Sequence, residues 1–365
     1  MHDFSKLKKK LQKDEFESFE KIYNILEDNK SKNIFYYRIL FDIERSNYNL
    51  LKLCQAMYFD NSIYNKSDMM YKRIIDYLLE DNNYEKDIYV YGYVKPIINF
   101  LENFNIREIY PQSIFKVIFS KINIKEKFLL VFEKFRYIKQ KNRINRNKNS
   151  SEVINIVLDN RKIKSENTLY ANYGTFVYNE YIKGIQYFGE SFLKFDDHEV
   201  FVDGGAYYLE TSKEFSYIVN GKYKMIYAFE PYKKIYESIE NNLNNIKIFN
   251  KGLYNKTTTK KFSASLNGDS RICESGSETI DLVDLDSLNI DATIVKLDIE
   301  GAELEALDGM KKTIKRCRPK LLISGYHKKL DTINIINKVL DIDNTYKVYI
   351  RHYNYNECET VIYFI

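Results

Sequence analysis

Cysteine, histidine and proline are scarce in this chain, whose 365 residues include four of each. No CxxC pair occurs and no cysteine has a histidine partner nearby, which argues against a zinc finger and a disulfide framework. The sequence therefore predicts reduced thiols, and the isolated histidines give no support to a metal site. The cysteines and histidines are Cys54, Cys273, Cys317, Cys358, His2, His198, His327 and His352.

Long apolar runs are also absent, although 44% of the residues are hydrophobic. No stretch reaches the roughly 18 apolar residues of a membrane-spanning helix. The charged first segment, MHDFSKLKKKLQKDEFESFEK, lacks the apolar core of a signal peptide. We expect no transmembrane segment, a cytoplasmic location, and enough apolar residues for substantial cores rather than disorder.

Positive charge is concentrated in the first part of the chain. Lys and Arg outnumber Asp and Glu by 28 to 20 in residues 1–150 and are outnumbered by 28 to 31 in residues 151–365. Seven of the 15 residues from Lys134 to Lys148 are basic, and none is acidic. We favour a solvated helix face for this segment over a site for nucleic acid, phospholipid or a diphosphate-linked sugar.

The most informative feature is the stretch Glu199 to Ala206, EVFVDGGA, where a short apolar strand runs into an acidic residue and two glycines. A helical pattern follows from Thr211. A buried strand, a glycine turn and a helix N-terminus form the nucleotide-binding crevice of doubly wound sheets. The sequence therefore predicts a ligand site at this turn.

Further short apolar segments follow at spacings that suit a parallel α/β sheet. Candidate functional residues stand where these strands end, the edge at which open parallel sheets bind ligands. The segments are MIYAFEP (225–231), IKIFNKGL (246–253), ATIVKLDIEGAE (292–303) and PKLLISGYH (319–327), followed by a terminal hairpin, YIRHYNYNECETVIYFI (349–365).

Several motifs in these segments resemble the FkbM-type methyltransferases, which use S-adenosylmethionine. The matching segments are VFVDGGA, YAFEP, NKGL, TIDLVDLDSL, IVKLDIEGAELEALDGM, RPKLLISGYHK and YIRHYNYNECETVIYF, covering roughly residues 185 to 365. The resemblance implies an α/β fold with a Rossmann-like seven-stranded class I methyltransferase sheet. In that sheet, strands one to five are parallel and the last hairpin supplies an antiparallel edge.

The resemblance also implies which residues bind the cofactor. We expect the Glu230 carboxylate to accept hydrogen bonds from both ribose hydroxyls, and Asp203 to orient the glycine turn or meet the methionine amino group. Glycine allows the backbone to approach the ligand closely. The expected cofactor-binding residues are Asp203, Gly204, Gly205, Ala206, Glu230, Asn250, Gly252, Leu253 and Asp298.

One position departs from the family pattern. Relatives read roughly DGGAYxGxT, whereas this chain reads DGGAYYLET, with Leu209 in place of the second glycine. A β-carbon there is expected to narrow the pocket or to force a different backbone angle.

The acids of LDIEGAE and the end of the fifth strand are the candidates for contact with the acceptor. His327 is the candidate general base and Asp298 the second candidate catalytic residue. Glu300, Glu303 and Tyr326 are expected to contact the substrate, with a cap on the helix N-terminus as the alternative for Glu303. Three close acids suit a divalent metal, but the resemblance implies a metal-independent enzyme.

The sequence predicts two domains: residues 1–150, mainly helical with a βα unit, and residues 151–365, the cofactor-binding domain with a helical lead-in over 151–195. Leu7, Leu11, Phe16 and Phe19 fall at helical spacing. A degenerate nucleotide-binding-like turn is expected near Gly92, and the stretch NKNSS (147–151) is the best linker.

Three functions remain open from the sequence. The first is transfer of a methyl group to a hydroxyl of a sugar, a polysaccharide precursor or a secondary metabolite. The second is an NAD(P)-dependent oxidoreductase, although GxGxxG is missing. The third is a non-catalytic binding protein whose cofactor site has decayed. We expect a small-molecule or glycan acceptor and no nucleic acid, and the oligomeric state, a homo-oligomer included, stays open.

Overall fold

The computed structural model describes residues 2–58, 79, 186–264, 270–353 and 357–365. The chain divides into two compact units, one made of residues 1–45 and 187–365, the other of residues 46–186. In the second unit, the described residues form one helix, α4 (Asn47–Ala56). The turn near Gly92, the basic segment 134–148 and the linker 147–151 lie outside the described residues and stay predictions.

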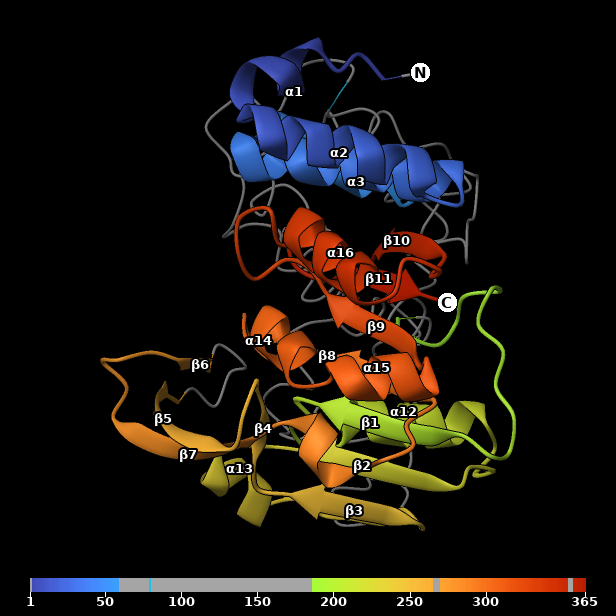
Figure 1. Ribbon diagram of the computed structural model, residues 1–365, viewed down its shortest axis with the longest axis vertical. Helices are drawn as coiled ribbons and strands as arrows, with labels where there is room; N and C mark the ends of the chain where they lie inside the picture. The colour runs from blue at the N-terminus through green and yellow to red at the C-terminus, as the bar shows by residue number, and fades with distance from the viewer. Residues whose placement is uncertain (1, 59–78, 80–185, 265–269, 354–356) are drawn as a thin grey trace, which may run out of the picture. The chain divides into compact units, whose positions relative to one another are not determined.

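The first unit is built on a seven-stranded sheet with the order β10-β11-β9-β8-β1-β2-β3 (Figure 1). The five strands from β9 to β3 pair in parallel, as the sequence predicted. The strands are β1 (Val200–Gly204), β2 (Met225–Phe229), β3 (Ile246–Phe249), β8 (Ile294–Leu297), β9 (Lys320–Ser324), β10 (Val348–His352) and β11 (Thr360–Phe364).

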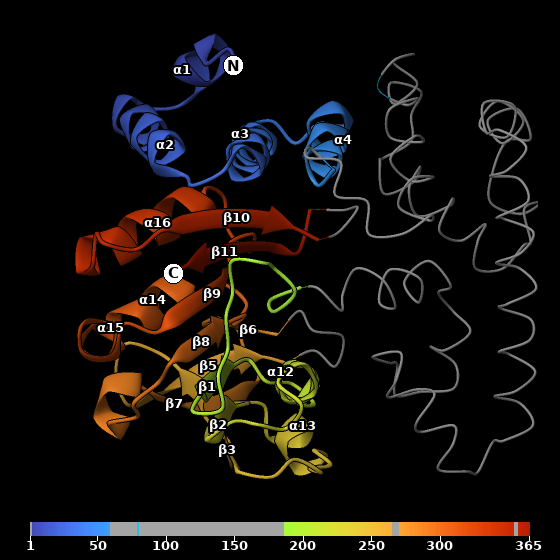
Figure 2. The ribbon, with the colours of Figure 1, turned by 90° about the vertical axis from the view of Figure 1, so that its right-hand side faces the viewer.

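Helices cover both faces of this sheet, which explains why its central strands are buried along their whole length. Every residue of β1, β8 and β11 is buried. Figures 1 and 2 show α12 and α13 on one face and α14, α15 and α16 on the other. The helices are α12 (Glu210–Ile218), α13 (Lys233–Glu237), α14 (Glu303–Asp308), α15 (Lys311–Cys317) and α16 (Asp331–Ile342).

The strand order reverses between β1 and β8, where the chain leaves one half of the sheet and starts the other. The connections on either side then lead to opposite faces, and their first turns separate at the carboxyl edge. Asp298 N–H donates to Gly204 O over 3.2 Å at this point. The reversal therefore places the DGGA turn beside the LDIEGAE segment.

The terminal hairpin differs in one detail from the prediction of an antiparallel edge. β11 is antiparallel to both β9 and β10 and lies between them. β10 forms the edge and therefore runs in the same direction as the five parallel strands.

A second, four-stranded sheet has the order β4-β7-β5-β6 and was not predicted. Ile280 and Leu282, at alternate positions of β7, pack with Phe262, Tyr232 and Ile235 in one buried cluster. This sheet lies beside α13 in Figure 1. Its strands are β4 (Gly252–Leu253), β5 (Thr258–Ser263), β6 (Arg271–Ile272) and β7 (Glu278–Val283), and the 3-10 helix η2 (Leu285–Leu288) follows.

Of the first three helices, α2 and α3 pack on the C-terminal half of the sheet, where both contact α16 and α3 contacts β10, and α1 contacts α2 (Figure 2). They are α1 (Ser5–Lys10), α2 (Lys13–Ile25) and α3 (Asn29–Ile43). The predicted apolar stripe of Leu7, Leu11, Phe16 and Phe19 is buried. Residues 1–45 thus belong with the sheet, whereas the sequence assigned them to a separate N-terminal domain. Among the described residues, no helix has the length and hydropathy to cross a membrane.

Candidate functional site

Asp203 is the next-to-last residue of β1 and is fully buried. Its carboxylate accepts a hydrogen bond from Ser212 Oγ over 2.6 Å and lies 3.2 Å from Lys296 Nζ. Lys296 also donates to the carbonyls of Gly204 and Gly205, at 3.1 and 2.8 Å. Lys296 therefore pairs with Asp203, and through its bonds to the two carbonyls it fixes the backbone of the glycine turn.

The DGGA glycines are required by neighbouring protein atoms. Gly205 has φ +75°, and a Cβ there would lie 1.9 Å from the Asp298 carbonyl oxygen. A Cβ on Gly204 would lie 2.9 Å from Leu297 and 3.1 Å from Leu253. Ala206 is buried, and its N–H donates to Phe229 O over 3.0 Å. The small residues thus let the turns after β1 and β8 approach each other.

Leu209 adopts a different backbone angle, which is one of the two consequences expected of a leucine at this position. Its φ of 67° is in the left-handed region, where a glycine is unstrained. Its side chain is fully buried in a cluster with Ala206 and Ala228, against Ile246 and Ile248 of β3. The leucine therefore replaces glycine by taking the glycine backbone angle and pointing its side chain into the core.

Glu230 follows β2 and is 6% exposed. One carboxylate oxygen accepts the N–H of Tyr207, in the glycine turn, over 3.0 Å. The other accepts the N–H of Tyr232, ahead of α13, over 2.8 Å. Burial raises the pKa of Glu230 to about 7, against the lowering effect of these two hydrogen bonds.

Three residues expected to bind the cofactor, Asn250, Gly252 and Leu253, follow β3 and lie close to the turn between β2 and α13. Asn250 Nδ2 donates to the carbonyls of Glu230 and Pro231, at 2.9 and 3.1 Å. Gly252 is buried in β4, where a Cβ would lie 2.7 Å from Leu282. Leu253 is also buried. Their expected role in cofactor binding stays a prediction, and within the described structure Asn250 fixes the backbone of Glu230 and Pro231.

Asp298 follows β8, and its side chain is 25% exposed. It accepts hydrogen bonds from the hydroxyls of Tyr187 over 3.0 Å and Tyr326 over 3.2 Å. Burial alone would raise the pKa of Asp298, but Lys296 and His327 hold it below its usual value. The carboxylate is therefore ionised at neutral pH and oriented by two phenols.

The bond from Tyr187 to Asp298 was not predicted from the sequence. Tyr187 is 4% exposed and its hydroxyl also lies 3.1 Å from Ser324 Oγ. Its backbone is in the left-handed region, with φ 67°. No local pattern marks this partner, since 111 residues separate Tyr187 from Asp298.

His327 follows β9 and is surrounded by carboxylates. Its Nδ1 lies 3.1 Å from Glu303, and its Nε2 lies 3.5 Å from both Asp298 and Glu300. Burial alone would lower the pKa of His327, but these three acids raise it to about 9. A histidine that holds its proton at neutral pH cannot accept another, so this geometry opposes the expected role of general base.

The two glutamates of LDIEGAE differ in burial and in hydrogen bonding. Glu303 is 2% exposed, and its Oε1 accepts the N–H groups of Ile299 at 3.0 Å and Gly301 at 3.3 Å. Glu303 thus binds the backbone of the loop ahead of α14, with no side-chain hydrogen bond at the helix cap itself, and little of it is open to a substrate. Glu300 has φ +56° and keeps 35% of its side chain exposed. Together with Tyr326 and Asp298 it remains a candidate acceptor contact.

Comparison with known proteins supports the resemblance found in the motifs. Residues 203–356 match the family model of the methyltransferase FkbM domain. A methyltransferase FkbM from Methylobacillus flagellatus is 24% identical, with a TM-score of 0.43, and the match covers 56% of each chain. A precorrin-6y C5,15-methyltransferase from Geobacter metallireducens is 18% identical with a TM-score of 0.28, covering 47% of this chain and 80% of that one. A search of curated proteins gives no match.

Proposed function

The chain carries a methyltransferase FkbM domain, and we propose that it transfers a methyl group from S-adenosylmethionine to a hydroxyl oxygen. The acceptor proposed is a sugar, a polysaccharide precursor or a secondary metabolite. The observation that carries the proposal is the buried Glu230 carboxylate at the end of β2, held against the glycine turn after β1. A carboxylate at this place is the usual partner of ribose hydroxyls in doubly wound folds.

The chemistry of Glu230 suits such a ligand. Each of its oxygens accepts one backbone N–H, which leaves each with capacity for another hydrogen bond. Burial disfavours its charged form, so the residue gains from two further hydroxyl donors. The residues present therefore fit a ribose, and the left-handed backbone of Leu209 keeps its side chain in the core instead of at this edge.

When bound, the cofactor would supply the electrophilic methyl group. The protein's part is then mainly alignment, because an in-line displacement gains most of its rate from positioning. In this proposal Glu230 fixes the ribose, and the turn at Asp203 to Ala206 positions the amino-acid end. Lys296 fixes that turn through its bonds to two carbonyls.

Asp298 takes the role nearest to the acceptor. It is ionised, partly exposed and oriented by Tyr187 and Tyr326. We assign it to accept the hydrogen bond of the acceptor hydroxyl, which turns a lone pair of that oxygen toward the methyl carbon, and to take the hydroxyl proton as the oxygen gains the methyl group. The charge of His327 then stabilises the Asp298 carboxylate instead of taking the proton.

Calorimetry tests the proposal. The full chain is titrated with S-adenosylmethionine, S-adenosylhomocysteine and NAD, and we expect binding of both sulfur compounds at one site and none of NAD. Glu230→Ala should weaken binding by at least a hundredfold. Glu237→Ala, on the exposed side of the adjacent α13, is the matched control and should bind as the wild type does. Binding of NAD alone supports an oxidoreductase, and binding of none of the three supports a decayed site.

A further inference from the structure

Three side chains from separate elements converge next to Asp298. Glu303 begins α14, His327 follows β9, and Asp331 begins α16. One donor atom from each lies within 4.8 Å of the others. Glu303 and Asp331 are each 2% exposed and the His327 side chain is 9% exposed. The group is therefore buried and assembled by the fold.

The imidazole of His327 has no hydrogen-bond partner at either nitrogen. Glu303 Oε1 is only 3.1 Å from Nδ1, but it lies off the direction in which that nitrogen can bond. Two ligands of one metal ion are arranged in this way, because each points at the ion and not at the other. At tetrahedral angles, bonds of about 2.0–2.2 Å from nitrogen and oxygen to Zn²⁺ separate neighbouring donor atoms by about 3.3–3.6 Å, a few tenths of an ångström more than the distance from Nδ1 to Glu303 Oε1.

The other side of the ring is also built for this role. Nε2 of His327 lies 3.5 Å from Asp298 and 3.5 Å from Glu300. A histidine that binds a metal through one nitrogen generally offers the N–H of its other nitrogen to a carboxylate, which fixes the tautomer and the ring orientation. Asp298 and Glu300 supply this second partner.

The local charge favours a cation. Four carboxylates face His327, those of Asp298, Glu300, Glu303 and Asp331. One imidazolium cannot neutralise them. Two lysines compensate these acids only in part: the single charge of Lys296 is shared between Asp203 and Asp298, and that of Lys328 lies beside Gly301 and Asp331. Buried carboxylates are costly unless a cation compensates them.

We propose that Glu303, His327 and Asp331 bind one divalent transition metal ion through an imidazole nitrogen and two carboxylate oxygens. Imidazole with carboxylate is a donor set that suits ions such as Zn²⁺, Mn²⁺ and Fe²⁺. The proposal departs from the metal independence that the family resemblance implies. It stands whether or not the chain transfers a methyl group: with the ion bound His327 is neutral, and the ion then supplies the positive charge that the imidazolium provides beside Asp298 in the metal-free chain.

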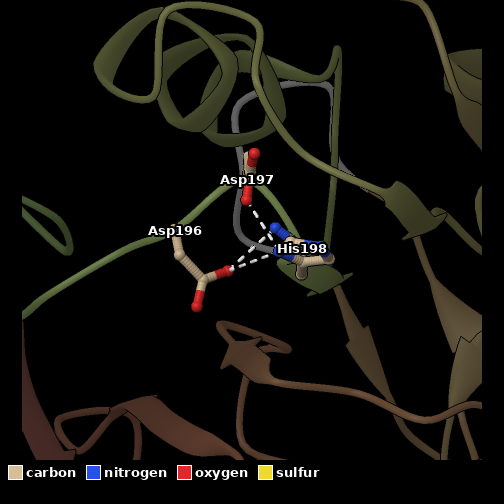
Figure 3. Close-up of side chains that lie close together, drawn as sticks. All are labelled: Asp196, Asp197 and His198. Atoms are coloured by element: carbon tan, nitrogen blue, oxygen red, sulfur yellow. Dashed lines mark hydrogen bonds and ion pairs between the residues drawn. The ribbon is translucent and has the colours of Figure 1, made fainter.

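A second group among the described residues offers a matched comparison. Asp196, Asp197 and His198 also place their donor atoms within 4.8 Å of one another (Figure 3). These three are consecutive, and their side chains are 67% to 84% exposed. His198 lies 2.7 Å from Asp197 in a direct ion pair. Solvated acids of this kind need no ion, so this group serves as the control.

The test uses the full chain, stripped with a chelator and titrated with Zn²⁺ and Mn²⁺ alone. We expect one ion per chain for the wild type, and binding at least tenfold weaker in Glu303→Gln and in Asp331→Asn. The double variant Asp197→Asn, His198→Asn should bind as the wild type does. Absence of binding to the wild type, or loss of binding only in that double variant, overturns the proposal.

A spectroscopic measurement on the wild type keeps the proposal testable if the buried variants fail to fold. X-ray absorption of the Zn²⁺-loaded chain should show nitrogen and oxygen scatterers at about 2.0–2.2 Å, including one imidazole. Sulfur scatterers at about 2.3 Å would assign the ion to cysteines and contradict the proposal. The ion should also raise the melting temperature of the wild type, because it binds the folded chain.

Discussion

Two glycines with the same backbone conformation show what the site demands of a single residue. Gly205 has φ +75° and its missing Cβ would overlap the Asp298 carbonyl at 1.9 Å, whereas Gly221, with φ +70°, has nothing within 4 Å. Gly221→Ala should cost only the left-handed strain, about 1 kcal/mol. Gly205→Ala should cost about 3 kcal/mol or more, since the turns after β1 and β8 must also separate. Urea denaturation measures both, and equal losses would mean that the approach of the two turns stabilises nothing.

Glu230 gives the site a dependence on pH. Its pKa is raised by burial to about 7, and hydrogen bonds from ribose favour the charged form, so binding should release a proton at pH 6. Affinity for S-adenosylhomocysteine should fall by on the order of tenfold from pH 7 to pH 6 and change little above pH 8. Calorimetry at each pH measures this. Glu230→Gln should bind weakly with a flat profile, and a sloped profile in that variant would place the titrating group elsewhere.

The raised pKa of Glu230 affects the stability of the ligand-free protein in the opposite direction: stability falls, instead of rising, as the pH increases. The folded-state value, about 7, lies above the ordinary value of 4.5, so the folded chain holds this proton more tightly than the unfolded chain. The contribution of Glu230 to stability is complete below pH 4.5 and is lost as the pH rises through 7. Glu230→Gln should remove this part of the pH dependence of urea denaturation.

At the scale of the elements, the buried Arg351 is one of the links between the N-terminal helices and the C-terminal hairpin. Arg351 of β10 donates to Glu190 over 2.9 Å and to Asp28, ahead of α3, over 2.7 Å. Arg351→Met would leave two acids without a cation and should cost about 3 to 5 kcal/mol. Lys347→Met is the control, because the exposed pair of Lys347 with Glu27 should contribute at most about 1 kcal/mol. Equal losses in thermal or urea denaturation would refute this account of the attachment.

The elements that the sequence predicted are those with continuous apolar strands and an acid or glycine at the end. Val200 to Val202 and Ile294 to Leu297 are buried throughout, as strands covered on both faces must be. The second sheet was missed because β5 reads TTKKFS, in which only Phe262 is buried. Its apolar partners come from β7 and from Tyr232, so the pattern is visible only once the chain is folded.

At the scale of the molecule, the sequence predicted which strand ends meet but not how their side chains pair. The reversal of strand order between β1 and β8 brings Asp203 and Asp298 together, and this follows from a doubly wound topology. The partners of His327 depend on the angle between α14 and α16, which no local pattern encodes. The association of residues 1–45 with the sheet was also missed. Their apolar stripe shows that one helix face is buried, but it does not show which part of the chain covers that face.

The central claim is that the carboxyl ends of β1, β2 and β8 form a site for S-adenosylmethionine. A crystal structure of the full chain with S-adenosylhomocysteine tests it most directly. We predict both ribose hydroxyls within hydrogen-bond distance of the Glu230 carboxylate, with Leu209 still in its cluster with Ala206 and Ala228. A ligand bound elsewhere, or a Glu230 carboxylate that keeps only the N–H groups of Tyr207 and Tyr232 as partners, would contradict it.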